Sequence, residues 1–359
     1  MAQPLIALAH LPEARWGRSD PAHLVRDGYT GNAVAYRCVR MIAEAAASIR
    51  FLSANEVVQN LMDEPSSEEA GQSLRERLYT DLQITGNAWL EAVTFDAETV
   101  PRVLLALRVD CVRVKHDPRG YFSGYGVSLK HGERLIEREA DGWSPVHHFK
   151  LYHPGDNTYG LSPLGAARKS LDVHNGAAGW AKALIDNAAR PSGALMYGKD
   201  GERLSDEQFD RLKEQLVQEH SGAMNAGRPL LLEGGLDWRP MSLSPVEMDF
   251  AETRHTAARE IALAFGVPPM LLGIPGDNTY ATYKEAHLAF WRLTILPLVQ
   301  KTANALSNWL SGRFENTAIK PDLDNVPAFA AEREALWARV SAADFLTADE
   351  KRRLLGLEP

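Results

Sequence analysis

Three histidines lie close together in the sequence and are the residues best suited to bind a metal ion. They are His147, His148 and His153, and imidazole nitrogens are common zinc ligands. Adjacent residues of a strand point to opposite faces, so His147 and His148 are poorly placed to share one ion. No cysteine accompanies them. The pattern favours polar residues beside a turn, and we expect no metal and no other cofactor.

One serine has neighbours that suggest a nucleophile. The segment from Gly160 to Gly165 reads GLSPLG, but its spacing differs from the nucleophile elbow of hydrolases. Serine followed by proline is typical of a helix start, because serine caps the helix and proline suits its first position. The sequence also lacks a glycine-rich phosphate loop ending in Lys-Ser or Lys-Thr. Ser162 is therefore interpreted as a helix cap, and we predict that the chain is not an enzyme.

Composition and charge exclude several other classes. The 359 residues are 45% hydrophobic and 24% charged, which is ordinary for a globular protein. No apolar run approaches the roughly 20 residues that span a bilayer, and the N-terminus lacks the basic region of a secretory signal. Cys38 and Cys111 suggest no disulfide framework. The net charge of -8 disfavours a sequence-specific DNA binder. It is compatible with a surface past which DNA slides.

The first half of the chain predicts an α+β unit. Helices are expected over 32–50 and 72–85, the second ending at Gly86. Residues 88–93, 103–114 and 121–129 are rich in β-branched and aromatic residues, and turn residues separate them. The pattern predicts an antiparallel sheet. No βαβ alternation is visible, which disfavours a nucleotide-binding fold.

The middle third predicts a small domain between two helices. A helix of about 40 Å should run from Ser162 to about Ala189. Its many small residues suit close packing against copies of itself. Strands at 193–197, 229–232 and 236–240 and a helix capped near Ser205 predict a compact insertion, with a turn at 233–235 between the last two strands.

The last third predicts helices around a glycine- and proline-rich loop. A helix from about Pro245 should stop at Gly266, where two prolines follow. After the loop, the sequence Thr282–Glu285 predicts a capping box that starts a long helix with a kink at Pro297. Two short helices separated near Asp344 complete the chain.

Several segments, taken in order, resemble the portal proteins of long-tailed bacteriophages. Residues 32–50 and LQITGNAW at 82–89 resemble the wing of that family. The entry to its stem resembles Gly160–Leu164, and its clip resembles 191–195 and 225–235. The most specific segment is FGVPPMLLG at 265–273, followed by a helix that carries Phe290 and Pro297. Each motif is weak alone, and their ordered occurrence identifies the chain as a member.

The resemblance implies an α+β portal fold that assembles as a dodecameric ring. Such a ring sits at the portal vertex of a virion capsid, assembled in the host cytoplasm, and admits double-stranded DNA without sequence specificity. Its expected partners are the major capsid protein, the large terminase and a head–tail adaptor protein, with no membrane. The implied segments are an arm and wing (1–162), a stem helix (163–190), a clip (191–244), a second stem helix (245–266), a channel loop (267–284), a linking helix (285–320) and a short crown (321–359).

The resemblance also indicates which residues meet DNA and the packaging motor. The implied channel-loop residues are Gly276, Asp277, Asn278, Thr279 and Tyr280, a set with one acidic and no basic side chain. The clip residues implied for terminase or adaptor contact are Asp206, Glu207 and Glu214. Two alternatives stay open: a metal-dependent nucleic-acid-processing enzyme that uses the histidine cluster, and a ring-forming scaffold unrelated to DNA. The parent particle is equally open between an infectious phage, a prophage remnant and a gene-transfer particle.

Overall fold

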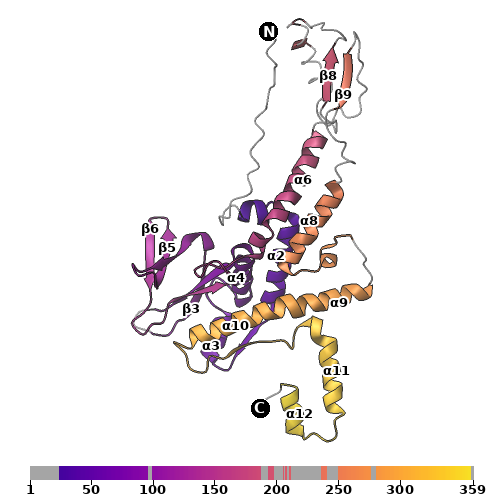
Figure 1. Cartoon of the computed structure of the whole chain (residues 1–359). Coiled ribbons are helices and arrows are strands. Elements are labelled where there is room, and N and C mark those ends of the chain that lie inside the picture. The colour runs from indigo at the N-terminus through magenta and orange to yellow at the C-terminus, as the bar shows by residue number, and fades with distance from the viewer. Residues whose placement is uncertain are drawn as a thin grey trace. The chain divides into compact units, whose positions relative to one another are not determined.

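The computed structural model describes residues 24–95, 99–186, 193–197, 205, 207, 210–211, 236–240, 250–275 and 280–356. The chain divides into two compact units. The larger joins Met1–Arg168 to Arg259–Pro359, and the smaller covers Lys169–Ala258. The larger unit is therefore built from two segments far apart in sequence, as the indigo and orange elements of Figure 1 show.

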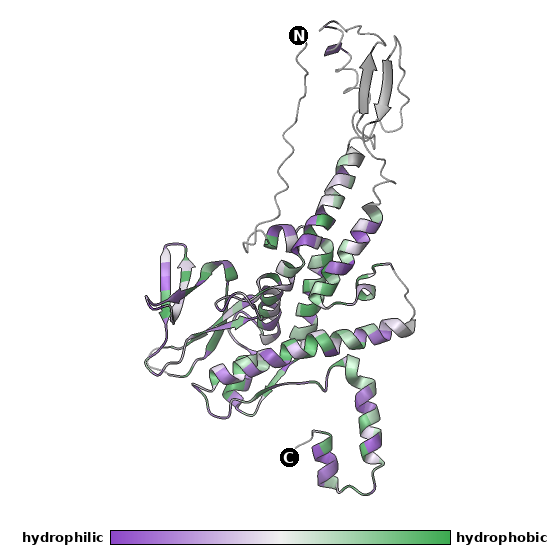
Figure 2. Ribbon diagram, viewed as in Figure 1, coloured by the Kyte–Doolittle hydropathy of each residue, from purple (hydrophilic) through white to green (hydrophobic). Residues whose placement is uncertain are grey.

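Two helices that pack on each other form the centre of the larger unit. The first, α2 (Ala33–Ser48), begins at Asn32, whose side-chain oxygen accepts hydrogen bonds from the next helical N–H groups. The second, α4 (Gly71–Thr85), ends at Gly86 with φ 78°, a left-handed conformation that glycine adopts freely. Figure 2 shows hydrophobic residues along α2, and its inward face is fully buried. Both helices confirm the sequence prediction.

A buried arginine donates hydrogen bonds to the C-terminal ends of two helices. Arg75 of α4 is only 9% exposed. Its guanidinium donates to the carbonyl oxygens of Ala47 and Met62, each at 3.3 Å, and lies 5.4 Å from the centre of the Phe51 ring. Those carbonyls belong to the last turns of α2 and of α3 (Glu56–Asp63), where a positive charge is favoured by the helix dipole.

Two antiparallel sheets lie beside these helices. Their shared core consists of buried side chains from both sheets, among them Trp89, Val112 and Tyr125. The strand orders are β3-β2-β7 and β4-β5-β6. The strand bounds are β2 (Asn87–Val93), β3 (Val103–Leu107), β4 (Val112–His116), β5 (Phe122–Leu129), β6 (Gly132–Glu137) and β7 (Val146–Lys150).

The run 103–114, predicted as one strand, is two strands in different sheets. A 3-10 turn at Val109–Cys111 separates them, and the Cys111 N–H donates to the Arg108 carbonyl oxygen at 3.0 Å. The Arg108 side chain pairs with Asp110 at 2.6 Å across the same turn. Hydrophobic content predicted the strands correctly, but it gave no sign of the turn between them.

The C-terminal part of the larger unit is mostly helical. Helix α9 (Tyr280–Phe290) continues through a π-helical turn (Trp291–Ile295) into α10 (Leu296–Leu310). Pro297, where a kink was expected, lies in the first turn of α10, directly after this π-helical turn. Further elements are β1 (Phe51–Ser53), which pairs with β10 (Ile319–Pro321), and the helices α11 (Ala330–Ser341) and α12 (Ala348–Leu354). The sequence prediction missed α3, β1 and β10.

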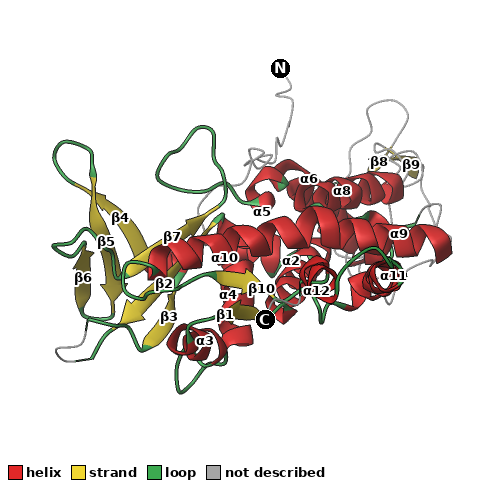
Figure 3. Ribbon diagram, turned by 90° about the horizontal axis from the view of Figure 1, so that it is seen from below, coloured by secondary structure: helices red, strands yellow, loops and turns green. Residues whose placement is uncertain are grey.

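The smaller unit holds most of one helix, the first part of a second helix and a strand pair. Helix α6 (Arg168–Asp186) runs beside the first part of α8 (Phe250–Phe265), up to Ala258 where the smaller unit ends (Figures 1 and 3). Strand β8 (Gly193–Tyr197) pairs antiparallel with β9 (Leu236–Pro240). The sequence predicted both strands but not their pairing, and the strand predicted at 229–232 lies outside the described residues. The stem helix expected from 163 is broken at Ala167, which has ψ 0°, so that α5 (Pro163–Ala166) stands alone before α6. Ser162 caps α5 by accepting from the Gly165 N–H at 2.8 Å, as its spacing predicted.

The fold is α+β, as the sequence predicted. Among the helices that the structure describes, none is long and apolar enough to cross a bilayer. The buried side chains gather around α2, α4 and α10 and between the two sheets. The two sheets and the helices α2, α4 and α10 therefore form the core of the larger unit.

Candidate functional site

The predicted channel loop is shorter than expected. Gly276, Asp277, Asn278 and Thr279 lie outside the described residues, and Tyr280 is the first residue of α9 rather than a loop residue. Thr282, predicted as a helix cap, lies inside that helix. The helix starts earlier than predicted because neither Tyr280 nor Ala281 is a helix breaker such as glycine or proline. Residues 269–272, also assigned to the loop, form a 3-10 turn.

Side chains of the larger unit hold the start of this segment. Gly266 ends α8 with φ 67°, and its carbonyl oxygen accepts a 2.7 Å hydrogen bond from the Thr294 hydroxyl. A Cβ at position 266 would lie 2.8 Å from that hydroxyl oxygen. Arg259 of α8 donates to the Pro275 carbonyl oxygen, directly before the residues predicted to line the channel. The base of the segment is thus fixed at two points.

Thr294 belongs to the π-helical turn between α9 and α10. Pro297 has no N–H to donate, so regular α-helical bonding cannot continue through this point. The Leu296 N–H instead donates to the Trp291 carbonyl oxygen, five residues back. The Trp291 side chain is buried, and its indole N–H donates to His287 Nε2 at 3.3 Å. Such bulges are frequent at functional sites, and this one contacts the base of the predicted channel segment through Thr294 and Gly266.

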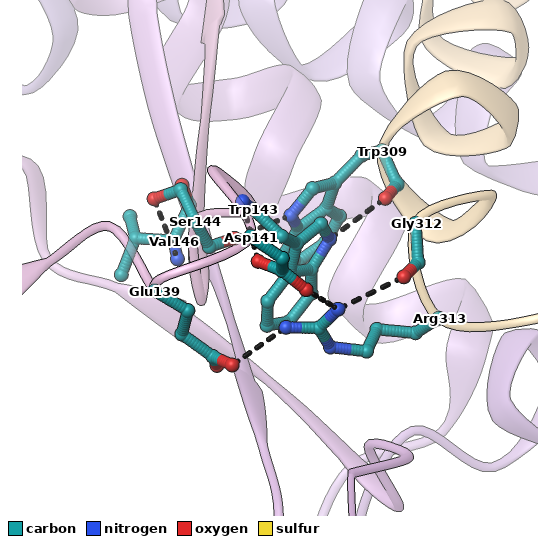
Figure 4. A network of polar contacts seen from close by, with 8 residues as sticks. All are labelled: Glu139, Asp141, Trp143, Ser144, Val146, Trp309, Gly312 and Arg313. Atoms are coloured by element: carbon teal, nitrogen blue, oxygen red, sulfur yellow. Dashed lines mark hydrogen bonds and ion pairs between the residues drawn. The ribbon is translucent and has the colours of Figure 1, made fainter.

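A network of aromatic and charged residues joins the wing to α10 (Figure 4). The Arg313 guanidinium pairs with Glu139 and Asp141 at 2.6 Å each and lies 4.1 Å from the centre of the Trp143 ring. The Trp143 indole N–H donates to the Trp309 carbonyl oxygen at 2.9 Å. Hydrogen bonding from Arg313 lowers the pKa of the Asp141 carboxyl. The turn between β6 and β7 is thereby attached to the end of α10.

The sequence prediction did not find this network. Its members lie on two segments more than 160 residues apart in sequence, as the Trp143–Trp309 hydrogen bond shows. The sequence carries one local trace of the network, the glycine at position 312. Only a residue without a side chain fits there, because a Cβ would come 2.6 Å from Trp143 Cδ1. A glycine at the end of a helix is common for other reasons, so it could not have pointed to a tryptophan.

The three histidines of the predicted cluster take part in ring stacking and hydrogen bonds. His148 Nε2 lies 2.9 Å from Asn87 Oδ1, and its ring stacks on Trp89 with 4.5 Å between ring centres. His147, the preceding residue of β7, stacks on Trp309 with 5.3 Å between ring centres. Burial lowers the pKa of His147 to about 4 and that of His148 to about 3.

The third member, His153, accepts a 3.0 Å hydrogen bond from the Gly155 N–H in a turn. Across the described ranges, no three histidine, cysteine, aspartate or glutamate residues are grouped so that they could hold a metal ion. Packing therefore accounts for His147 and His148, and turn formation accounts for His153.

Of the three acidic residues predicted for the clip, the structure describes only Glu207. Glu207 is exposed. Asp206 and Glu214 lie outside the described residues. The β8–β9 pairing, with Gly193 opposite Pro240, supports a small domain at this point of the chain.

Comparison with known proteins decides the family. The model of the phage portal protein family matches residues 33–356. The chain belongs to this family. A probable portal protein of Streptomyces phage phiC31 is 26% identical, with 90% of this chain and 74% of the relative covered. An uncharacterized protein of Rickettsia bellii (strain RML369-C) is 39% identical over 97% of this chain and 92% of the relative.

A solved structure gives the portal assignment its strongest support. The neck of a native GTA (gene transfer agent) particle, computed with C12 symmetry, contains a chain that is 49% identical and superposes with a TM-score of 0.73. The match covers 96% of this chain and 95% of that chain. The portal fold with wing, stem and C-terminal helices is thereby confirmed, and the protein is a structural portal subunit. The resemblance of FGVPPMLLG and its ordered neighbours identified the family correctly.

Proposed function

We propose that this portal protein forms a twelve-membered ring at one vertex of a capsid and that double-stranded DNA enters and leaves through it. The near full-length match to the GTA neck chain, at 49% identity, carries this proposal. The composition of helix α6 suits a ring. The small residues of α6 allow close approach between copies, and the heterologous contacts of a closed ring need two different faces on each subunit.

The particle is proposed to be of the gene-transfer type. Identity to the GTA chain is 49%, whereas identity to the phiC31 portal protein is 26%. A relative at 39% identity is from a bacterium. The protein is then a virion component of the portal vertex that is assembled in the host cytoplasm. Its role is passage and docking rather than catalysis.

Three protein partners follow from a position at the vertex. The ring contacts the major capsid protein around its edge. The clip, with Asp206, Glu207 and Glu214 as candidate contacts, receives the large terminase during packaging and a head–tail adaptor protein afterwards. The exposure of Glu207 supports an accessible clip surface.

The segment Gly276, Asp277, Asn278, Thr279 and Tyr280 is proposed to face the passing DNA. Its start is held in place by Arg259 at Pro275 and by Thr294 at Gly266. The segment has one acidic and no basic side chain. Because lysine and arginine would pair with phosphates and release counterions, their absence allows DNA to slide without being held.

The ring itself is tested by mass photometry and electron microscopy of the purified full-length protein and of intact particles. Twelve copies around an axial hole are expected. Monomers in both preparations would overturn the portal proposal. The nuclease alternative is tested by incubating the same protein with plasmid DNA and Mg²⁺, Mn²⁺ or Zn²⁺, where no cleavage is expected.

The channel segment is tested by the double substitution Asn278→Lys and Thr279→Lys. New ion pairs with phosphate should slow packaging, measured as nuclease-protected DNA against time. The matched control adds two lysines at exposed wing and loop positions, Tyr121→Lys and Tyr152→Lys, which are 71% and 81% exposed. Equal packaging rates in both variants would indicate that another part of the channel contacts the DNA, and the ring proposal would still stand.

A further inference from the structure

The last two helices of the chain have almost no core of their own. Val340 is the one buried residue of α11, and α12 has none. Figure 1 shows the two helices as a hairpin at the C-terminal end. Large apolar side chains stay in solvent: Phe345 is 86% exposed, Leu354 56% and Trp337 45%. We call residues 330–356 the C-terminal hairpin.

Few contacts hold this hairpin to the rest of the larger unit. Arg292 of the π-helical turn pairs with Glu332 at 2.5 Å, and Trp291 meets Phe329 edge-on with 6.2 Å between ring centres. Both contacts lie at the start of α11. Between the two helices, the Lys351 ammonium donates to the Ser341 carbonyl oxygen at 3.0 Å. Beyond its first turn, the hairpin is therefore stabilised mainly by local bonds.

Local bonds are not enough to keep such helices folded in water. Helix α11 has 12 residues and α12 has 7, and isolated helices shorter than about 12–15 residues are marginal. The capping box of Thr347 and Glu350 fixes where α12 starts, but a cap adds only a small increment. Exposed Trp, Phe and Leu on a hairpin without a core indicate a surface that another molecule covers.

We propose that this surface is covered by the C-terminal hairpin of a second copy of the chain in the ring. The inference rests on the proposed ring. Ring symmetry places an identical hairpin beside each one, at a local concentration fixed by the rest of the subunit. A heterologous contact then sets Phe345 and Leu354 of one copy against α11 of the next.

The charges of the hairpin agree with a second copy as the occupant. It has five acidic and five basic side chains. Glu334, Arg339, Asp344 and Arg353 form no ion pair within the part of the chain that the structure describes. These two acids and two bases can pair with their opposites on a neighbour. A DNA-binding surface would need a surplus of positive charge, which the hairpin lacks.

The test places a photo-crosslinking residue, p-benzoylphenylalanine, at position 345 of the full-length protein. Rings are assembled from a mixture of ¹⁵N-labelled and unlabelled copies and then irradiated. Mass spectrometry should find position 345 joined to residues 330–356 in peptide pairs of mixed isotope content. The same group at Tyr121, an equally accessible aromatic position of the wing, serves as the control and should not join to 330–356.

Each outcome decides the proposal. Intact rings whose cross-links from position 345 stay within one chain, or go to DNA or to a capsid protein, would overturn it and leave the portal function intact. Absence of rings in every preparation would overturn both.

A second measurement does not depend on cross-linking chemistry. In rings of the variant Phe345→Ser with Leu354→Ser, hydrogen exchange of amides 330–356 should speed up at least tenfold. Tyr121→Ser should leave those amides unchanged. Unchanged exchange in the double variant would refute burial of these side chains between copies.

Discussion

Removing the Arg313 side chain should detach the wing turn from α10. The side chain is 9% exposed and stacks on Trp143, with 4.1 Å from the guanidinium carbon to the ring centre. We expect the variant Arg313→Ala to fold, because no charge becomes buried without a partner: Glu139 and Asp141 are 48% and 55% exposed. The wing should be less stable but intact.

The magnitude follows from the individual contacts. A cation–π contact that is largely shielded from water contributes about 1 kcal/mol, and an ion pair with a half-exposed glutamate adds about 0.5 kcal/mol. The Asp141 carboxyl lies in solvent and is not counted. A loss of about 1.5 kcal/mol corresponds to a decrease in Tm of about 3–6 °C for a domain of this size.

The assay is thermal unfolding followed by tryptophan fluorescence, since Trp143 and Trp309 are part of the network. Arg108→Ala is the matched control: Arg108 pairs with Asp110 at 2.6 Å but is 72% exposed. Its loss should lower Tm by less than about 1 °C. Equal, small shifts for the two variants would show that the stacked guanidinium contributes no more than a surface ion pair.

Two further predictions concern the loop base and the wing histidines. Gly266→Ala should destabilise by about 1 kcal/mol more than Gly273→Ala, because both have positive φ but only a Cβ at 266 meets Thr294 Oγ1; equal urea midpoints would contradict this. For His148, burial lowers the pKa from 6.5 to about 3, so below pH 6.5 the unfolded chain takes up a proton that the folded chain does not. Stability should therefore fall between pH 6.5 and 3, by up to about 1.4 kcal/mol per pH unit from this group, and His148→Gln should show a shallower fall.

Local rules predicted the elements that local forces build. Ser162 was recognisable as a helix cap, and Gly86 and Gly266 as helix ends, because each acts on neighbours within a few residues. Thr347 and Glu350, three residues apart, form another such local feature, a capping box at the start of α12.

Interactions between distant segments were not predictable in the same way. The β1–β10 pair joins Phe51 to Pro321, and three-residue strands have too little pattern to be noticed. Arg75 reads in sequence as an ordinary surface residue of a helix. Only the fold shows that it serves two helix ends at once.

The π-helical turn connects features that the sequence presents as separate. Thr294 holds the end of α8, Arg292 pairs with Glu332 at the start of the C-terminal hairpin, and Trp291 is buried against the body. All three side chains belong to one π-helical turn of five residues. A displacement of the loop base would therefore act on the attachment of the hairpin. If neighbouring hairpins cover one another in the ring, such a displacement in one copy reaches the next through that contact.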